Sequence, residues 1–484
     1  MNEKARSAIE GGSRRTLILI GAVLVAVWVV PMSRSLWLDE TITWWVVQGG
    51  IGQAIHRAIS YQQSPLYYLL AWPFARAGGH SEFVLRVPSV LSAVAAAILL
   101  WRLARRVIGK QAAPFAVLAF AGTWASVEAH DARPYALALA FAIGAALALV
   151  ELLDRPRARS ACLYGLLVAA MVWAHYLSAV VLVAHGVYVV IRRRKGTTSI
   201  GWGPALVAVG LGLILVLPLA GQIASLWARR FALGTGGSAG FFGMFLLISN
   251  PVVVPAVAIA AAVCRARPSF VRFPLRDSGG ALILGLTFLP PLTLFAASWA
   301  TAPQFLNGRY LVSATPGTAL LVAWGLMTLR PEAVRRATMW TLAILTAVAF
   351  SIWADHTDDW RSAVGAVAAN ADEETLVLAR VGLVEAKQVD WLTDPERSAY
   401  LLAPFSFYPV AADPVALPLY PHDPGADAYL TGLLHGPIHE RDRFVLIERY
   451  DTYRLWFEER LVPLGWSSRV IGSYGGPEVS EFTR

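Results

Sequence analysis

Two groups of acidic residues stand at the ends of apolar segments, where their carboxylates could take part in chemistry. With the basic residues beside them, they are Asp39 and Glu40 in the first group and Glu128, His130, Asp131 and Arg133 in the second. Acidic side chains at membrane depth cost free energy unless they are paired or solvated. If the loops that carry them converge, the two groups form one acidic site with an arginine beside it. The alternative is that they are interfacial charges that face water.

The composition places these groups in a membrane protein. Hydrophobic residues make up 56% of the 484-residue chain and charged residues only 15%, with a mean hydropathy of +0.54. A bilayer core about 30 Å thick needs roughly 20 apolar residues per helix, and such windows recur with Arg-rich breaks between them. We predict eleven spans, near residues 16–32, 84–101, 113–128, 134–151, 161–174, 176–191, 202–222, 241–264, 279–299, 310–329 and 337–354.

The distribution of positive charge predicts how the spans are oriented. One alternate set of connections holds 22 Lys and Arg residues, and the other set, with its helix ends, holds 8. Because Lys and Arg are retained on the cytoplasmic side, the N-terminus is predicted to be cytoplasmic and everything after Ala354 extracytoplasmic. Five of the 11 acids in residues 1–354 then lie outside, and these include both acidic groups.

The first outer loop, residues 33–83, is neither polar enough for a plain loop nor apolar enough for a span. The spacing of its apolar residues predicts two amphipathic helices on the membrane surface, over 50–60 and 64–76. The alternative is an ordinary re-entrant or packing segment. The pairs Trp44-Trp45 and Tyr67-Tyr68 are interpreted as interfacial anchors.

The chain after residue 354 differs in charge from the part before it. Residues 1–354 carry a net charge of +19, which the membrane topology explains without a nucleic-acid partner, whereas residues 355–484 carry −10. Apolar runs over 375–381 and 443–448 predict strands, and 453–464 predicts an amphipathic helix. The segment 404–424, rich in Pro and Asp, is predicted to be irregular. We therefore expect a small extracytoplasmic α/β domain over 355–484.

Several short motifs, in this order and spacing, resemble one known family. They are Trp37-Leu38-Asp39-Glu40, Ser64-Pro65-Leu66-Tyr67-Tyr68-Leu69-Leu70, Ser81-Glu82-Phe83-Val84-Leu85-Arg86-Val87-Pro88-Ser89, Ala132-Arg133-Pro134-Tyr135-Ala136-Leu137, His175-Tyr176 and Gly308-Arg309-Tyr310-Leu311. The chain resembles the polyprenyl-phosphate-sugar-dependent glycosyltransferases of the GT-C fold, close to the protein O-mannosyltransferases and aminoarabinose transferases of glycosyltransferase family 39. Asp358-Asp359-Trp360-Arg361 also looks like an element of bacterial relatives.

This resemblance implies a fold and a cellular setting. It implies an α-helical polytopic membrane domain of about eleven transmembrane helices over residues 1–354, with an outward-facing active site. The setting is a bacterial-type inner or plasma membrane. The partners are a polyprenyl-phosphate-linked sugar donor, a cell-envelope acceptor that is a glycan, lipid or protein, and the lipid bilayer.

The resemblance also implies roles for the residues that match. Asp39 is the candidate base for the acceptor proton, with Glu40 as a second carboxylate that orients the acceptor. The candidates for the donor phosphate are Arg133, Arg309 and Tyr310, because guanidinium groups bind phosphate in a bidentate manner. The sugar and acceptor pocket is assigned to Glu128, His130, Asp131, Tyr135 and His175. Inversion at the anomeric carbon is what this fold implies.

Each role has a structural alternative. The alternative for Asp39 is that it only pairs with a nearby arginine. The alternative for Arg133 and Arg309 is that they cap helix ends or extend to lipid headgroups. A histidine at a span junction, such as His175, is more often structural than catalytic. No cofactor is certain, although a divalent metal held by Asp39, Glu128, His130 and Asp131 is an open alternative, since hard cations favour carboxylates.

Two other functions compete with glycosyl transfer. A transporter or flippase for a lipid-linked sugar is expected to show inverted repeats and polar residues at the midplane, whereas here the ionisable residues gather at one face, which favours chemistry there. A non-catalytic envelope assembly protein would not need Asp39. The chain departs from the eukaryotic protein mannosyltransferases in having no β-trefoil insertion in its outer loops. Gln63-Ser64-Pro65 stands where bacterial relatives often have His-Pro-Pro, which leaves the acceptor open.

Overall fold

The computed structural model describes residues 16–228, 279–301, 308–329, 332–353 and 358–484. The chain divides into two compact units. The first, here called the helical unit, comprises Met1–Met32, Ile55–Leu70 and Arg86–Ala354; the second, here called the sheet unit, comprises Ser33–Ala54, Ala71–Leu85 and Asp355–Arg484. Residues of the first outer loop thus cluster with the C-terminal residues. The predicted domain division at residue 354 stays a prediction.

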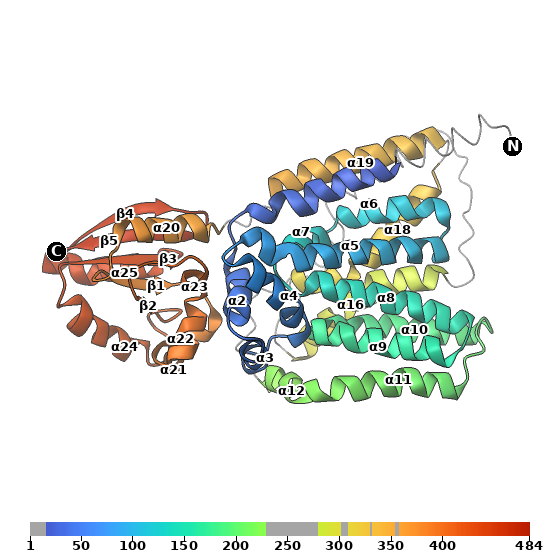
Figure 1. Ribbon diagram of the computed structural model, residues 1–484, viewed down its shortest axis with the longest axis horizontal. Coiled ribbons are helices and arrows are strands. Elements are labelled where there is room, and N and C mark those ends of the chain that lie inside the picture. Colours follow the sequence, from blue (N-terminus) through green and yellow to red (C-terminus); the bar gives the residue numbers. More distant parts are fainter. Residues whose placement is uncertain (1–15, 229–278, 302–307, 330–331, 354–357) are drawn as a thin grey trace. The chain divides into compact units, whose positions relative to one another are not determined.

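Helices account for almost all of the described chain before residue 354 (Figure 1). In chain order they are the π-helix η1 (Val25–Val29) and the 3₁₀-helix η2 (Val30–Ser33), then α2 (Leu38–Val47), α3 (Ile51–Ser60), α4 (Pro65–Gly78), α5 (Glu82–Val107), η3 (Lys110–Ala112), α6 (Ala113–Ala121), α7 (Trp124–His130), α8 (Tyr135–Asp154), α9 (Ala158–Ala174), η4 (Tyr176–Val180), α10 (Val181–Arg194), α11 (Trp202–Val216), η5 (Leu217–Leu219), α12 (Ala220–Ala228), α16 (Gly279–Thr301), α17 (Gly308–Leu311), η6 (Val312–Ala314), α18 (Thr315–Met327) and α19 (Glu332–Trp353).

Seven helical stretches among the described residues are long and apolar enough to cross a membrane. They are Thr16–Ser33, Glu82–Val107, Tyr135–Asp154, Tyr176–Arg194, Trp202–Ala228, Gly279–Trp299 and Arg309–Met327, and Ala158–Ala174 is a shorter apolar helix. Each coincides with a predicted span, so the chain is a multi-pass membrane protein. The predicted span over 241–264 lies outside the described residues, and the count of eleven stays a prediction.

The predicted span over 113–128 is instead two helices, α6 and α7. Gly122 follows the last residue of α6, and the backbone of Thr123 is extended, with φ −103° and ψ 168°. The Thr123 hydroxyl donates to the carbonyl of Phe120, 2.7 Å away, which lies in the last turn of α6. Glycine is a poor helix former and threonine favours helix starts, and hydropathy alone does not register that break.

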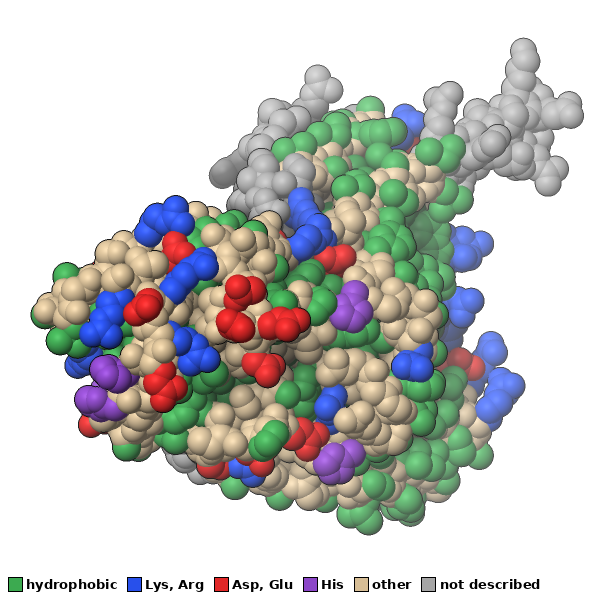
Figure 2. Space-filling model, turned by 60° about the vertical axis from the view of Figure 1, so that its left-hand side comes forward, with side chains coloured by type: hydrophobic (Ala, Val, Ile, Leu, Met, Phe, Trp, Pro, Cys, Tyr) green, Lys and Arg blue, Asp and Glu red, His purple; other side chains and the backbone are tan. Residues whose placement is uncertain are grey.

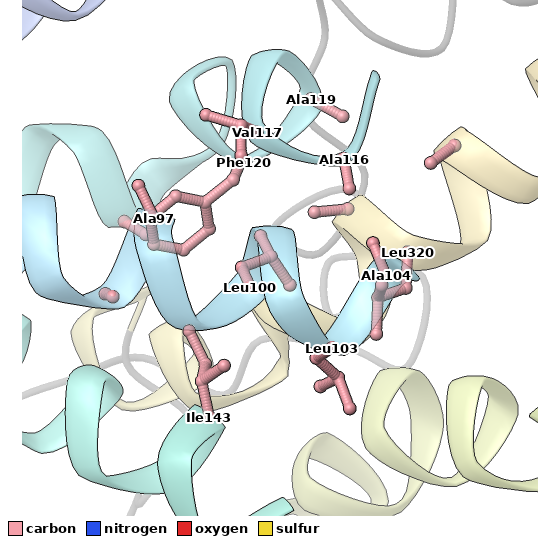
Figure 3. Packing of buried hydrophobic residues seen from close by; sticks show 14 of the residues in the cluster. Ala97, Leu100, Leu103, Ala104, Ala116, Val117, Ala119, Phe120, Ile143 and Leu320 are labelled. Carbon is pink, nitrogen blue, oxygen red and sulfur yellow. The ribbon is translucent and has the colours of Figure 1, made fainter. Parts of the chain in front are cut away.

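Small and branched side chains form the interior of the helical unit (Figure 3). Leu100 of α5 and Phe120 of α6 are buried, as are Ile143 of α8 and Leu320 of α18. Alanines between them let the helices approach closely, which is how helices pack in a membrane, where burial from water supplies little driving force. At Gly317 of α18, a Cβ atom would come within 2.3 Å of a backbone nitrogen of α16.

The outer surface of the helical unit is rich in hydrophobic side chains, shown green in Figure 2. Ile214 of α11 is 69% exposed and Leu213 is 67% exposed. A water-soluble surface rarely exposes continuous apolar patches, and this one suits contact with lipid.

One end of the helical unit carries a cluster of ion pairs. Asp154 at the end of α8 pairs with Arg192 of α10 at 2.9 Å and with Arg106 of α5 at 2.5 Å. The three Arg-rich connections next to these residues therefore lie at the same end of the bundle. This agrees with the prediction that they lie on the same side of the membrane. The side of the membrane that this end faces stays a prediction.

Helices α3 and α4 lie where the sequence predicts two amphipathic helices in the first outer loop, and their location on the membrane surface stays a prediction. Ile51, Ile55 and Ile59 form an exposed apolar row on α3, which suits a membrane surface. The helix α2 was not predicted, because its apolar residues show no clear helical periodicity.

Within the sheet unit, loop residues bond to C-terminal ones. The indole Nε1 of Trp44 donates to the Ser406 carbonyl at 2.9 Å. Arg361 pairs with Glu82 at 2.7 Å. Trp44 is 6% exposed and Trp45 is fully buried, so their interpretation as interfacial anchors is wrong: both indoles pack inside this unit.

The C-terminal residues form five strands and several helices. These elements are α20 (Trp360–Asn370), β1 (Leu376–Arg380), η7 (Val384–Lys387), α21 (Val389–Thr393), α22 (Pro395–Leu401), α23 (Ala403–Phe407), β2 (Pro414–Ala416), α24 (Ala426–Leu433), η8 (Leu434–Ile438), β3 (Arg443–Arg449), α25 (Thr452–Leu461), η9 (Val462–Leu464), β4 (Ser467–Ser473) and β5 (Pro477–Thr483). The strand order is β2-β1-β3-β5-β4. Strands β1, β2 and β3 are parallel, and β5 is antiparallel to both β3 and β4.

Both faces of this sheet are covered. Leu378 of β1 and Leu446 of β3 pack on one face with Phe457 of α25 and Leu430 of α24, and α20 contacts β3, β4 and β5. The predicted strands over 375–381 and 443–448 and the helix from Tyr453 are confirmed. The segment 404–424 is not irregular throughout, because it contains most of α23 and all of β2. That strand is a three-residue edge strand that begins with Pro414, a position where proline is tolerated.

Candidate functional site

The connection between α7 and α8 carries the second acidic group. Helix α7 ends at His130 and α8 begins at Tyr135, directly after Pro134; proline suits a helix start because its missing N–H would find no partner in the helix. The backbone N–H of Arg133 donates to the Asp131 carbonyl at 2.7 Å. Asp131 is fully buried and Arg133 is 9% exposed. This connection therefore holds charged side chains inside the protein.

Arg133 is fixed through both its side chain and its backbone. Its Nη1 donates to the Tyr68 hydroxyl at 3.4 Å, and that hydroxyl donates to Gln63 Oε1 at 2.8 Å. The Ser89 hydroxyl donates to the Arg133 carbonyl at 3.2 Å and lies 2.7 Å from the Tyr67 hydroxyl. Tyr68 thus holds the guanidinium on one side, and Ser89, next to Tyr67, holds the backbone of the same residue.

The sequence suggested that Tyr67 and Tyr68 are interfacial anchors, and the structure shows that they are not. Both are essentially fully buried, with ring centroids 5.8 Å apart in an edge-to-face arrangement. A buried tyrosine needs a partner for its hydroxyl, and each finds one beside the α7–α8 connection. Their role beside Arg133 was not predicted, because a Leu-Tyr-Tyr-Leu run on an amphipathic helix does not show what the hydroxyls contact.

Three aromatic side chains predicted for the site form a row. The Tyr135 ring at the start of α8 lies 5.1 Å from the His175 ring, and the His175 ring lies 5.9 Å from the Tyr310 ring of α17. His175 directly follows α9, whose helical path ends there with an extended backbone, φ −159° and ψ 116°. The structure therefore brings together residues that are far apart in the sequence.

Charged groups from three segments also converge on this row. Arg133, Glu128 and Arg309 all act electrostatically on the Tyr135 hydroxyl, and the charge of Arg133 acts on His175. Two guanidinium groups and one carboxylate thus lie near a buried phenol, and one of these guanidinium groups also lies near the imidazole. Such an arrangement can bind a phosphate group and hold the polar face of a sugar beside it.

His130 and Asp131 lie beside each other. His130 Nε2 is 3.6 Å from Asp131 Oδ1, and its Nδ1 is 3.1 Å from the Ser126 carbonyl oxygen. Both side chains are buried, at 2% and 0% exposure. Their assignment to the sugar and acceptor pocket stays a prediction.

Within the part of the chain that the structure describes, no group of three or more His, Cys, Asp or Glu side chains could hold a metal ion. Glu128, His130 and Asp131, all in the helical unit, therefore do not form such a group.

Asp39 and Glu40 belong to the sheet unit, at the start of α2. Glu40 Oε2 accepts the backbone N–H of Trp37 at 3.2 Å, and the Glu40 N–H donates to the Trp37 carbonyl at 3.0 Å. Glu40 is fully buried, and its carboxylate satisfies the helix start in the manner of a capping box. Asp39 is partly exposed in the same helical turn. The catalytic roles of both residues stay predictions.

Comparison with known proteins agrees with this architecture. The sequence model of the dolichyl-phosphate-mannose-protein mannosyltransferase family matches residues 62–221, about a third of the chain. No curated protein sequence matches the chain. The crystal structure of ArnT from Cupriavidus metallidurans in the apo state is similar, with a TM-score of 0.53 at 14% identity, over 97% of this chain and 98% of that chain. The same protein bound to undecaprenyl phosphate matches with a TM-score of 0.52 at 14% identity, over 96% and 97% of the two chains.

The matched family segment contains Tyr68, Arg133 and His175, three residues of the site described above. The structural match extends over nearly the whole chain, the C-terminal residues included. The fold expected from the motifs is thereby confirmed: the chain has the GT-C fold, and its residues 62–221 match the dolichyl-phosphate-mannose-protein mannosyltransferase family.

Proposed function

We propose that this protein transfers a monosaccharide from a polyprenyl-phosphate-linked donor to a cell-envelope acceptor at the extracytoplasmic face of the membrane. The observation that carries this proposal is the convergence of Arg133, Arg309 and Glu128 on the aromatic row of a helical, membrane-crossing unit. The undecaprenyl phosphate bound to ArnT, a protein of the same fold, supports a donor of this class.

In this proposal Arg133 and Arg309 hold the donor phosphate, together with Tyr310. The Arg133 guanidinium is already oriented by Tyr68, so less conformational entropy is lost when phosphate binds. The two positive charges stabilise the phosphate as it leaves, because negative charge builds up on its oxygen in the transition state. Tyr135, His175, Glu128, His130 and Asp131 form the pocket for the sugar and the acceptor.

Asp39 is the proposed base, and Glu40 the second carboxylate of the acceptor side. An acceptor oxygen or nitrogen attacks the anomeric carbon while the bond from that carbon to the phosphate oxygen breaks. The acceptor proton passes to Asp39, and the electron pair of the broken bond leaves with polyprenyl phosphate. Attack opposite the leaving group inverts the anomeric carbon.

The proposed orientation follows the distribution of positive charge. The cluster around Asp154 contains Arg106 and Arg192, and we assign it to the cytoplasmic side because Lys and Arg are retained there. The N-terminus is then cytoplasmic, and the C-terminal domain and the first outer loop are extracytoplasmic.

The test uses purified full-length protein in lipid vesicles with a panel of radiolabelled polyprenyl-phosphate sugars. Release of free polyprenyl phosphate is measured, because a flippase moves its lipid without cleaving it. We expect turnover with one donor class, a loss of about 10²–10⁴-fold in Asp39→Asn and a loss of about 10²–10³-fold in Arg133→Gln.

Matched controls are Asp427→Asn, at an exposed position of α24, and Arg159→Gln, at an exposed position of α9. Both should keep wild-type turnover. Absence of release with every donor, together with wild-type behaviour of Asp39→Asn in cells, would overturn the transferase and favour a transport or assembly role.

A further inference from the structure

The strand order of the C-terminal sheet reverses between β1 and β3, and two charged residues lie at the carboxyl ends of these two strands. The chain passes from β1 to β2 on one side and then to β3 on the other side of β1. In open parallel sheets, ligands bind beyond the carboxyl ends of the strands at the point where the strand order reverses in this way. Arg380 ends β1, and Glu448 lies opposite it in β3.

Arg380 is 2% exposed, although it carries a full charge. It continues the alternation of Leu376 and Leu378 on the face that packs against α24 and α25. Its Nε donates to the Leu419 carbonyl at 2.8 Å, and its Nη1 donates to the Arg449 carbonyl. Among the described residues, no carboxylate forms an ion pair with it. A buried charge whose hydrogen bonds go only to neutral carbonyl groups is costly.

Within the described residues Glu448 forms no ion pair with Arg380, because both of its carboxylate oxygens accept backbone N–H groups. Its Oε2 accepts the backbone N–H of Tyr453 at 2.7 Å, and its Oε1 accepts the N–H of Arg454 at 2.6 Å. These contacts cap the start of α25. The guanidinium therefore keeps capacity for an anion from outside the domain.

Two tyrosines extend this site to the surface. The Tyr420 and Tyr450 rings lie 5.4 and 5.6 Å from the Arg380 guanidinium carbon, and they are 38% and 63% exposed. Tyr450 has a positive φ of 70°, which is uncommon for a residue other than glycine and is often found where function requires it. The Tyr420 ring is also stacked on the His422 ring, and the Arg449 guanidinium lies 5.5 Å from the Tyr450 ring. Tyr450 is the more exposed of the two, so its ring is the surface on which a sugar would pack.

A buried hydroxyl completes the set. Tyr453 is 0% exposed, and within the described residues its hydroxyl has no hydrogen-bond partner. The charges of Arg380, Asp423 and Glu448 act on it, so it belongs to the same cluster. A buried hydroxyl without a partner costs free energy, and a bound ligand would supply the missing bond.

We infer that Arg380, Tyr453, Tyr420 and Tyr450 form a second ligand site, which binds a saccharide bearing a carboxylate or a phosphate group. The anionic group lies against Arg380 and the Tyr453 hydroxyl, and the sugar ring packs on the exposed part of Tyr450. The site is separate from the proposed transfer chemistry and does not require it.

Isothermal titration of the full-length protein in detergent tests this site. The probes are glucuronate and glucose 1-phosphate, which distinguish carboxylate from phosphate, with glucose and inorganic phosphate as references. We expect at least one charged sugar to bind at least tenfold more tightly than both references. Arg380→Gln should weaken that binding at least tenfold, and Tyr453→Phe should weaken it about threefold or more.

Tyr453→Phe removes only a hydroxyl without a partner, so it keeps the test decisive if Arg380→Gln unfolds the domain. Arg460→Gln is the matched control, because Arg460 also lies over an aromatic ring, at 4.1 Å from Trp456, but at the exposed surface. It should bind like wild type. The inference is overturned if no charged sugar binds in preference to glucose, or if inorganic phosphate binds as tightly. Binding lost in Arg133→Gln but retained in Arg380→Gln and Tyr453→Phe also overturns it.

Discussion

The two units place apolar and charged groups in opposite ways. In the helical unit Leu213 is 67% exposed, whereas Arg133 and Asp131 are buried. In the sheet unit Phe444 and Phe457 are fully buried, and charged pairs such as those of Glu481 with Arg443 and Arg469 lie near the surface. The hydrophobic effect requires water as the alternative environment. It therefore drives the sheet unit together, whereas close packing of small residues holds the helices.

This contrast can be broken by placing the same substitution on both units. Leu213→Asp puts a carboxylate on the lipid-facing surface of α11 and should cost about 3 kcal/mol, since aspartate is strongly disfavoured at the centre of a membrane helix. Leu455→Asp, on α25, is also at an exposed apolar position, 46% exposed, and should be nearly neutral because water solvates the new charge. Heating the protein in lipid vesicles and measuring the remaining folded fraction compares the two; equal losses would contradict the contrast.

A buried carboxylate gives the sheet unit a dependence on pH. Burial raises the pKa of Glu448 from 4.5 to about 7, against the two backbone N–H groups and Arg380, which lower it. The folded protein then holds this proton more tightly than the unfolded chain. Its stabilising effect is fully present below pH 4.5 and is lost as the pH rises through about 7. We expect the free energy of unfolding of this unit to fall by about 2 kcal/mol between pH 5 and 7.

Hydrogen exchange of the β1 and β3 amides, corrected for the intrinsic effect of pH, measures this change. Glu448→Gln has no carboxyl to titrate and should show a flatter profile over the same window. If the stability of Glu448→Gln depends on pH as steeply as that of the wild type, another group is responsible.

The smallest effect is expected at the surface of the sheet unit. Arg361→Ala removes the pair with Glu82 and a hydrogen bond to the Ser33 carbonyl. The Arg361 side chain is 47% exposed, and ion pairs of that kind contribute less than about 1 kcal/mol. Protection of the α2 and α20 amides should change only slightly, with turnover preserved. A loss as large as that of Leu213→Asp would show that this contact matters far more than its exposure suggests.

Much of the fold was predictable from the sequence. Long apolar windows identified the spans, and the apolar runs of β1 and β3 identified the centre of the sheet. The exceptions have local causes. Hydropathy does not detect the break at Gly122 and Thr123, and β2 is too short and too rich in proline around it to give a strand pattern.

The site was predictable as a set of residues rather than as a set of contacts. Arg133, Tyr135, His175 and Tyr310 were named from motifs, and the helical unit brings them together. The contact from Tyr68 to Arg133 was missed, because two residues 65 positions apart meet only once the helices have packed. Arg380 was missed as well, since an arginine at the end of an apolar run looks like the exposed end of a strand.

The bond from Trp44 to Ser406 joins residues 362 positions apart. A ribosome adds about 5–20 residues per second, so the partner of Trp44 is made roughly 20 to 70 s after Trp44 itself. During that interval α2, whose Trp45 and Val46 are fully buried in the finished protein, has no C-terminal partner to pack against. In the nascent chain, α2 must therefore be kept from water by the membrane surface or by a chaperone until the last quarter of the protein has been synthesised.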